Sequence, residues 1–135
     1  NTILKFKSNM DSGMFKPIQR AAVAALSQGG SWHNELNAEY EERRKIARRI
    51  MELVGCTYDS KTAGMFVWCR MPEGSESAEA FCDRFLYDAH VFLTPGHIFG
   101  KNGEGYIRIS LCADQETLER ALIRIQKVVL KAEEA

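Results

Sequence analysis

Apolar residues recur along this chain at two spacings, and each spacing predicts one type of secondary structure. Helical spacing predicts four helices, which begin near Pro17, cover about 34–54, follow Ser75 or Ser77, and follow Asp114. Runs rich in β-branched and aromatic residues predict four short strands, at 56–58, 65–70, 91–94 and 106–111.

The order of these elements predicts an α/β fold. The order along the chain is helix, helix, strand, strand, helix, strand, strand, helix, and amphipathic helices of this kind cover the apolar face of a sheet. We therefore expect a two-layer α/β sandwich with a small mixed sheet. The long helix over 34–54 is expected to be a connector that enters a compact domain of about 100 residues, and Gly55 is expected to end it.

The segment over 1–30 contains two polar breaks. Ser8–Gly13 is rich in Asn, Asp, Ser and Gly and predicts a loop before the helix at Pro17. Gln28–Ser31 contains two glycines and is expected to end that helix. The chain begins with Asn1 instead of Met, which suggests a trimmed sequence.

Composition gives no support for nucleic acid or a membrane as partner. The 135 residues fit one domain, and 18 basic residues balance 18 acidic ones. The basic run over 43–49 is matched by glutamates over 35–42, so we interpret it as a solvated helix face. No apolar stretch approaches the roughly 20 residues of a membrane span, and residues 1–7 lack the apolar core of a signal peptide.

The cysteines indicate a reducing compartment. Four are present, none of them in a CxxC pair, which argues against a zinc site. Each lies in an apolar context, so we expect buried free thiols and a cytoplasmic location. They are Cys56, Cys69, Cys82 and Cys112.

Arg108 does not fit its surroundings. Strict alternation places Tyr106, Arg108 and Ser110 on one face of the predicted strand and the apolar residues on the other face. An arginine in the middle of a short strand is costly to bury without a partner. Two interpretations follow. Arg108 is exposed or ion-paired on a solvated face of the sheet, or its guanidinium binds a carboxylate in a bidentate manner.

The preceding loop favours the second interpretation of Arg108. Residues 95–105 contain four glycines and one proline, which is typical of backbone that approaches a ligand closely. The glycine spacing does not match a phosphate-binding loop. His97 has no visible Ser or Cys nucleophile paired with it, so we expect it to be a hydrogen-bonding loop residue.

Several motifs, in the correct order, resemble one family. Pro95-Gly96-x-x-Phe99-Gly100 followed by 105–111 resembles the C-terminal signature of the class I/II, fold-type-I, pyridoxal-phosphate-dependent aminotransferases. Residues 64–68 followed by Met71-Pro72 resemble that family's G-x-F-x-W strand, and Tyr40 with Arg43-Arg44 resembles its connector helix. The resemblance covers essentially the whole chain.

The resemblance implies roles for three residues. Arg108 would bind the α-carboxylate of the substrate. The loop containing Asn9 and Ser12 would lie at the interface of a homodimer, near the phosphate of pyridoxal 5'-phosphate in the neighbouring subunit; a turn or a helix cap is the alternative for both residues. Phe99 and Trp68 are expected to pack in the core of the domain.

The resemblance also implies what this chain lacks. The family's cofactor lysine lies in a Ser-x-x-Lys stretch with an arginine about eight residues later, and neither Lys5 nor Lys7 matches it. Residues 1–30 would be the end of the large domain with its interface loop and helix, and residues 31–135 the C-terminal small domain. No catalytic residue and no metal ligand is expected in this fragment, which should be inactive alone.

Three functional hypotheses remain open at this point. The parent protein would be an aminotransferase of aspartate, alanine or diaminopimelate type, with an amino acid and a 2-oxo acid as substrates. Alternatively, it would use the same fold for C–S β-elimination or for condensation with an acyl-CoA. The third hypothesis is a non-catalytic interaction domain.

Overall fold

The computed structural model describes residues 1–10 and 13–134. They form two compact units, Asn1–Asn37 and Ala38–Ala135. The helix α3 (Gly30–Leu53) begins in the first unit and ends in the second. It starts before the predicted position, because Gly30 and Ser31 join the helix instead of breaking the chain.

The first unit contains α1 (Thr2–Met10), α2 (Lys16–Leu26) and the start of α3. The prediction of a loop from Ser8 was wrong for Ser8 and Asn9, which lie in the last turn of α1. Ser8 Oγ and Asn9 Nδ2 both donate to the carbonyl of Lys5, at 3.1 and 2.7 Å. Both side chains thus bond back to a carbonyl of the preceding turn, which lets these polar residues lie within the helix.

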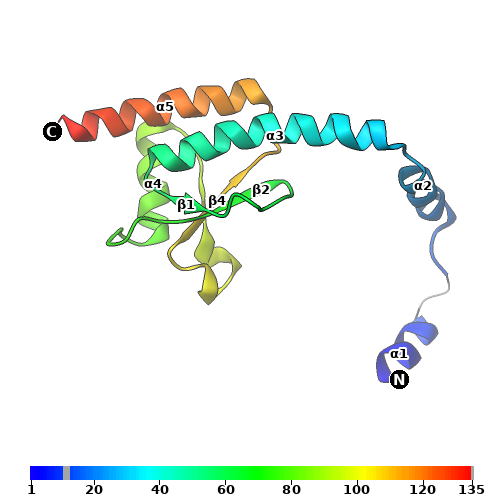
Figure 1. Cartoon of the computed structure of the whole chain (residues 1–135). Helices are drawn as coiled ribbons and strands as arrows, with labels where there is room; N and C mark the ends of the chain where they lie inside the picture. The colour runs from blue at the N-terminus through cyan, green and yellow to red at the C-terminus, as the bar shows by residue number, and fades with distance from the viewer. Residues whose placement is uncertain (11–12, 135) are drawn as a thin grey trace. The chain divides into compact units, whose positions relative to one another are not determined.

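The second unit is built on a four-stranded sheet of order β1-β2-β4-β3 (Figure 1). The strands are β1 (Thr57–Tyr58), β2 (Phe66–Arg70), β3 (Thr94–Pro95) and β4 (Tyr106–Ser110). The α/β class is confirmed, but all the pairings are antiparallel, where a mixed sheet was expected. The reason is that β2 and β3 run in the same direction and β4 lies between them, which splits the β-α-β unit.

Of the predicted strand over 91–94, only Thr94 lies in a strand, and β3 continues to Pro95. The helix α4 (Ala78–Ala89) ends at His90, which adopts the left-handed conformation with φ 53°. Val91 N then donates to Phe85 O at 3.1 Å, so this segment is still bonded to the helix. Only Thr94 and Pro95 pair with β4. Proline is tolerated in β3 because β3 is an edge strand.

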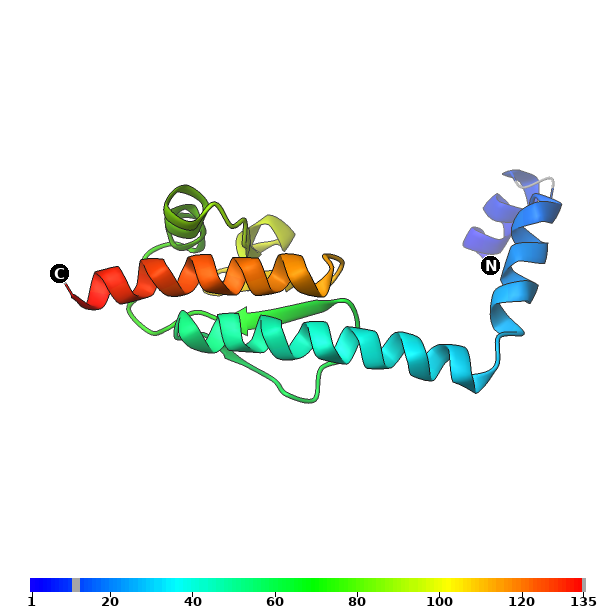
Figure 2. The ribbon, with the colours of Figure 1, turned by 90° about the horizontal axis from the view of Figure 1, so that it is seen from above.

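Helices cover one face of this sheet. Figure 1 shows α3 and α5 (Gln115–Glu133) on the same side of the strands, and Figure 2 shows them side by side from above. The core between the layers is apolar, and its fully buried members include Phe85, Ile50, Met51, Leu93, Ile107, Leu111, Ile125, Val67 and Cys69.

Local signals place the ends of the helices. Ser77 Oγ accepts a hydrogen bond from Ala80 N at 3.2 Å, which identifies it as the N-cap of α4. Asp114 Oδ1 accepts from Thr117 N at 2.7 Å, which caps α5. Hydrogen bonding from the side chain of Thr117, and then from its backbone, lowers the pKa of the Asp114 carboxyl. Gly55, which has a φ of 76°, follows α3 as predicted.

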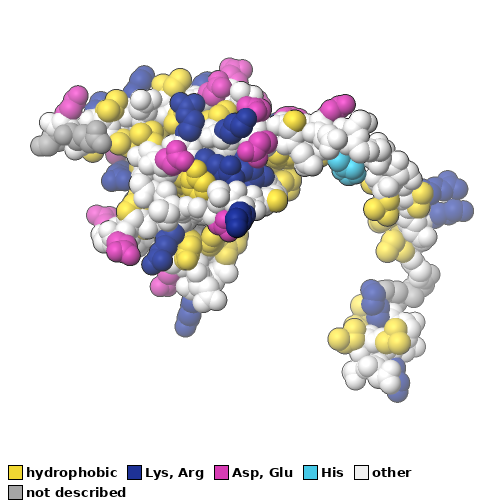
Figure 3. Space-filling view, in the orientation of Figure 1, with side chains coloured by type: hydrophobic (Ala, Val, Ile, Leu, Met, Phe, Trp, Pro, Cys, Tyr) yellow, Lys and Arg dark blue, Asp and Glu magenta, His cyan; other side chains and the backbone are white. Residues whose placement is uncertain are grey.

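The surface corrects two expectations. Cys56, Cys69 and Cys82 are buried, but Cys112 is exposed. The basic run of α3 is not wholly solvated: Arg44 is 6% exposed, while Lys45 beside it is exposed. On the face drawn in Figure 3, basic and acidic side chains are interspersed over the second unit. Within the described ranges, no helix is long and apolar enough to cross a membrane.

Candidate carboxylate-binding site

The site lies on the face of the sheet opposite the helices. The alternation of β4 is as predicted: Ile107 and Ile109 are buried in the core, and Arg108 lies on the other face. The register places Arg108 opposite Trp68 of β2 and Thr94 of β3. Arg108 is therefore in an interior strand with a neighbour on each side, where its side chain is half-buried.

Aromatic rings surround the guanidinium group of Arg108. Its Cζ lies 4.1 Å from the ring centroid of Phe66 and 4.4 Å from that of Phe99. Trp68 extends the cluster, because its ring meets Phe99 edge-on at 5.8 Å and stacks on Tyr106 at 5.6 Å. Phe99 and Trp68 thus belong to the open face, and the prediction that they pack in the core was wrong.

The polar groups of Arg108 are left unpaired. Among the described residues, its guanidinium has no hydrogen-bond or ion-pair partner, and its Nε is buried without one. A guanidinium presents five N–H donors and is charged at every ordinary pH. A half-buried cation of this kind, flanked by rings, is suited to receive an anion that fits two parallel N–H donors, which is a carboxylate.

The glycine-rich loop determines where Phe99 lies. It folds into two short 3-10 helices, η1 (Gly96–Phe99) and η2 (Lys101–Gly103). A Cβ on Gly96 would lie 2.3 Å from Gly103 O and 2.7 Å from Tyr106 O. Since real Cβ atoms do not approach backbone so closely, the two segments can pass each other only with glycine at this position.

The family resemblance assigns Asn9 and Ser12 to the cofactor phosphate of a neighbouring subunit. Asn9 lies in the first unit, and its amide donates to Lys5 O. Ser12 lies outside the described residues. The sequence of this chain has no Ser-x-x-Lys stretch. The chain therefore lacks the stretch that holds the cofactor lysine in the family, and the unpaired guanidinium of Arg108 is a candidate site for a carboxylate.

Phe66 is the residue that sequence reasoning missed. The run over 65–70 is apolar on both faces near its centre, which is a signal in the sequence for an aromatic residue on the open face. Its register opposite Ser110, which places it diagonally beside Arg108, depends on the pairing of strands far apart in sequence.

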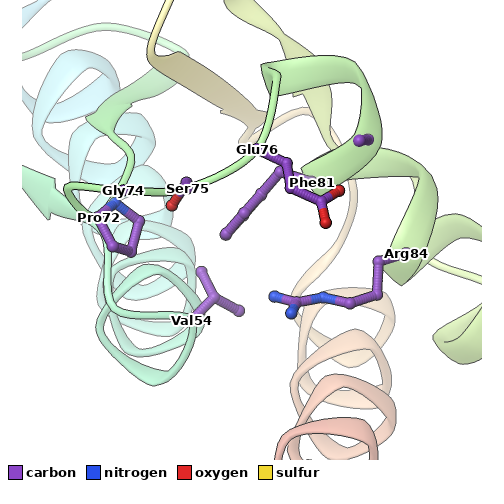
Figure 4. A pocket seen from close by; sticks show the side chains of 8 residues that line it. Val54, Pro72, Gly74, Ser75, Glu76, Phe81 and Arg84 are labelled. Carbon is purple, nitrogen blue, oxygen red and sulfur yellow. The ribbon is translucent and has the colours of Figure 1, made fainter.

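A separate cavity of about 360 Å³ lies between the end of α3 and the start of α4 (Figure 4). Its lining combines apolar Val54 and Phe81 with Arg84, whose guanidinium lies over the rings of Phe81 and Phe85. Glu76 supplies the opposite charge, and both charged side chains are exposed. The arrangement is a solvated surface hollow in which the charges balance.

Comparison with known proteins supports the family resemblance. The family model described as aminotransferase class I and II matches residues 1–125. The LL-diaminopimelate aminotransferase of Maridesulfovibrio salexigens is 40% identical over 124 residues, which are 92% of this chain and 32% of that protein. Transaminase BacF of Bacillus subtilis is 36% identical over 127 residues, covering 93% of this chain and 32% of BacF.

Solved structures give the same result. The apo-BacF structure from Bacillus matches with a TM-score of 0.75 and 35% identity, over 93% of this chain and 32% of that one. A Pyrococcus structure described as protein-A1 matches with a TM-score of 0.79 and 30% identity, over 97% and 34%. The chain spans about a third of the length of these relatives.

Proposed function

The chain belongs to the class I and II aminotransferases, and we propose on this basis that it is the C-terminal part of an enzyme that transfers an amino group between an amino acid and a 2-oxo acid. Pyridoxal phosphate would act in that enzyme as the electron sink. Because this chain has no Ser-x-x-Lys stretch, the lysine that holds the cofactor is expected to lie in another part of that enzyme, and the chain alone is expected to be inactive.

Arg108 carries the proposal for this chain. We propose that its guanidinium binds the α-carboxylate of both substrates. The supporting observation is that the half-buried group has no polar partner among the described residues, while rings hold it from two elements. Two parallel hydrogen bonds to a carboxylate would fix both the position and the orientation of the substrate. Orientation of this kind lowers the barrier of a reaction by several kcal/mol.

The remaining parts of the proposal concern the whole protein. Residues 31–135 would be the small domain, and residues 1–30 the end of the large domain. The enzyme would be a homodimer in the cytoplasm, with Asn9 and Ser12 near the cofactor phosphate of the neighbouring subunit. LL-diaminopimelate is the first amino donor to test, because relatives that match over most of this chain are named for it.

The test is steady-state kinetics of the longer protein that carries this chain, with Arg108→Lys beside the matched control Arg70→Lys. Arg70 lies on the same face of the sheet and is exposed. A lysine cannot form the two-pronged contact, so Arg108→Lys should raise KM for donor and acceptor and lower kcat/KM by about tenfold or more. Wild-type kinetics in this variant would refute the role of Arg108.

The same assay distinguishes the alternative reactions. A transaminase needs a 2-oxo acid acceptor and converts it into a new amino acid. A C–S β-elimination proceeds without an acceptor, and a condensing enzyme requires an acyl-CoA. Turnover that is independent of the 2-oxo acid would therefore refute the proposed transamination and leave the carboxylate site intact.

A further inference from the structure

Two rings approach the guanidinium of Arg108 from different elements. Phe66 belongs to β2, while Phe99 ends η1, which follows β3 on the other side of β4. Both centroids lie close to the same carbon, at 4.1 and 4.4 Å. Two rings in the same direction from the group would overlap at such distances. The rings therefore approach the guanidinium from different directions.

We propose that Phe66 and Phe99 are positioning residues that bracket the Arg108 guanidinium, so that the site accepts planar carboxylates and discriminates against tetrahedral anions. This inference rests on the proposed carboxylate role of Arg108 and adds the residues that set its selectivity. With a ring in each of two directions and Nε buried, the edge formed by the two Nη atoms is the direction left for a ligand.

The shape of this opening explains the selectivity. A carboxylate is flat, so its two oxygens can lie in the guanidinium plane and form two parallel hydrogen bonds. A sulfonate or phosphonate has a third oxygen out of that plane, which is directed toward one of the rings. An oxygen against an apolar ring face loses its hydration without gaining a hydrogen bond.

The fold holds both rings in place before any ligand arrives. Phe66 lies at the start of β2, where Leu111 N donates to Met65 O at 2.9 Å and ties β2 to the end of β4. Phe99 is held by the close passage of Gly96 against Gly103 and by the edge of Trp68. A guanidinium already fixed in one rotamer loses less conformational freedom when it binds.

Burial in the core does not account for these two rings. Phe66 is 39% exposed and Phe99 is 53% exposed, whereas Phe85 of the core is fully buried. Replacement by leucine should consequently leave the fold intact, which makes a direct test practical.

The experiment uses NMR of this chain, with the Nε–Hε signal of Arg108 as readout. The variants are Phe66→Leu and Phe99→Leu, with Phe66→Tyr and Phe99→Tyr as aromatic rescues and thermal unfolding as the check of folding. The ring current of an aromatic side chain changes the chemical shift of a proton that lies over the ring. Each Leu variant should move the unliganded Arg108 signal away from its wild-type position, and each Tyr variant should restore it.

Selectivity is then measured with acetate and methanesulfonate, which have equal charge and similar size. The wild-type chain should bind acetate at least about tenfold more tightly than methanesulfonate. In each Leu variant the ratio of the two dissociation constants should fall toward one. If the Arg108 signal is unchanged in both Leu variants, or if the ratio of the two dissociation constants is unchanged, then Phe66 and Phe99 do not position Arg108 as proposed. Absence of any acetate response in the wild type would instead contradict the carboxylate role itself.

Discussion

Two arginines of the same compact unit are held in opposite ways. Arg44 of α3 is 6% exposed, its Nη2 donates to Gly64 O at 2.8 Å, and its Nε lies 3.3 Å from Glu41. Arg108 of β4 is half-buried and contacts rings, with no polar partner among the described residues. The hydrogen bonds of Arg44 tie the fold together, and those of Arg108 remain available for a ligand.

A single unpaired nitrogen does not make this distinction. Nε of Arg43 and Nη1 of Arg44 are also buried without a partner. However, Arg43 donates through Nη1 to Leu111 O at 3.1 Å and pairs with Glu39, so the group as a whole is satisfied. The informative feature is a complete guanidinium without polar partners.

The largest expected effect is on stability, at Arg44. Arg44→Met keeps most of the buried volume but leaves Gly64 O without its hydrogen bond, so the free energy of unfolding should fall by about 2 kcal/mol. Urea unfolding measures it. Arg49→Met is the matched control, because Arg49 is exposed on the same helix. This control should change the free energy of unfolding by no more than about 0.5 kcal/mol. Equal effects of the two substitutions would remove the contrast.

At Arg108 the expected effect on stability is much smaller. Arg108→Met removes a half-buried charge that has no hydrogen-bond or ion-pair partner among the described residues, and the apolar methionine can still pack against the rings of Phe66 and Phe99. Replacing such a group by an apolar one is neutral or stabilising. The free energy of unfolding should therefore stay within about 0.5 kcal/mol of wild type or rise. A loss as large as that expected for Arg44→Met would show that Arg108 is a structural residue.

The smallest expected effect concerns the rates at which the four cysteine thiols react. Burial raises the pKa of Cys56 from 9.0 to about 11 and that of Cys69 and Cys82 to about 12, while Cys112 is exposed. One thiol per chain should react quickly with a disulfide reagent near pH 8, and Cys112→Ser should abolish this fast phase. Two or more fast thiols in the folded wild-type chain would contradict the burial.

The same shifts give a pH dependence with a defined sign. A thiol whose pKa is higher in the folded state than the unfolded value near 9.0 favours folding while both states are protonated. This contribution is complete below pH 9 and is lost as the pH rises toward 11 or 12. Stability should therefore decline in that range.

Local patterns predicted much of this fold. The alternation of β4, a cap at Ser75 or Ser77, the cap at Asp114 and the stop at Gly55 each depend on neighbours within a few residues. The structure confirms the alternation, the cap at Asp114 and the stop, and it selects Ser77 of the two serines. The antiparallel sheet was not predicted, because placing β4 between β2 and β3 depends on contacts between distant segments.

The candidate site was only partly predictable for the same reason. Arg108 stands out because a charge interrupts an alternating strand, which is visible in the sequence alone. The rings of Phe66 and Phe99 reach it through strand register and loop folding, which no local pattern encodes. The burial of Arg44 was missed because it depends on Gly64, which is 20 residues away along the chain.

The most direct test of the central claim is a titration of this chain with pyruvate, followed by the NMR signals of the arginine Nε–Hε groups. Neutral methyl pyruvate is the control ligand, and exposed Arg70 is the control residue. We predict that pyruvate shifts the Arg108 signal with a Kd on the order of 10 mM, as expected for one charge-assisted contact, and that the ester does not. Equal responses to acid and ester, or a response of Arg70 in place of Arg108, would contradict the assignment of Arg108 as the carboxylate-binding residue.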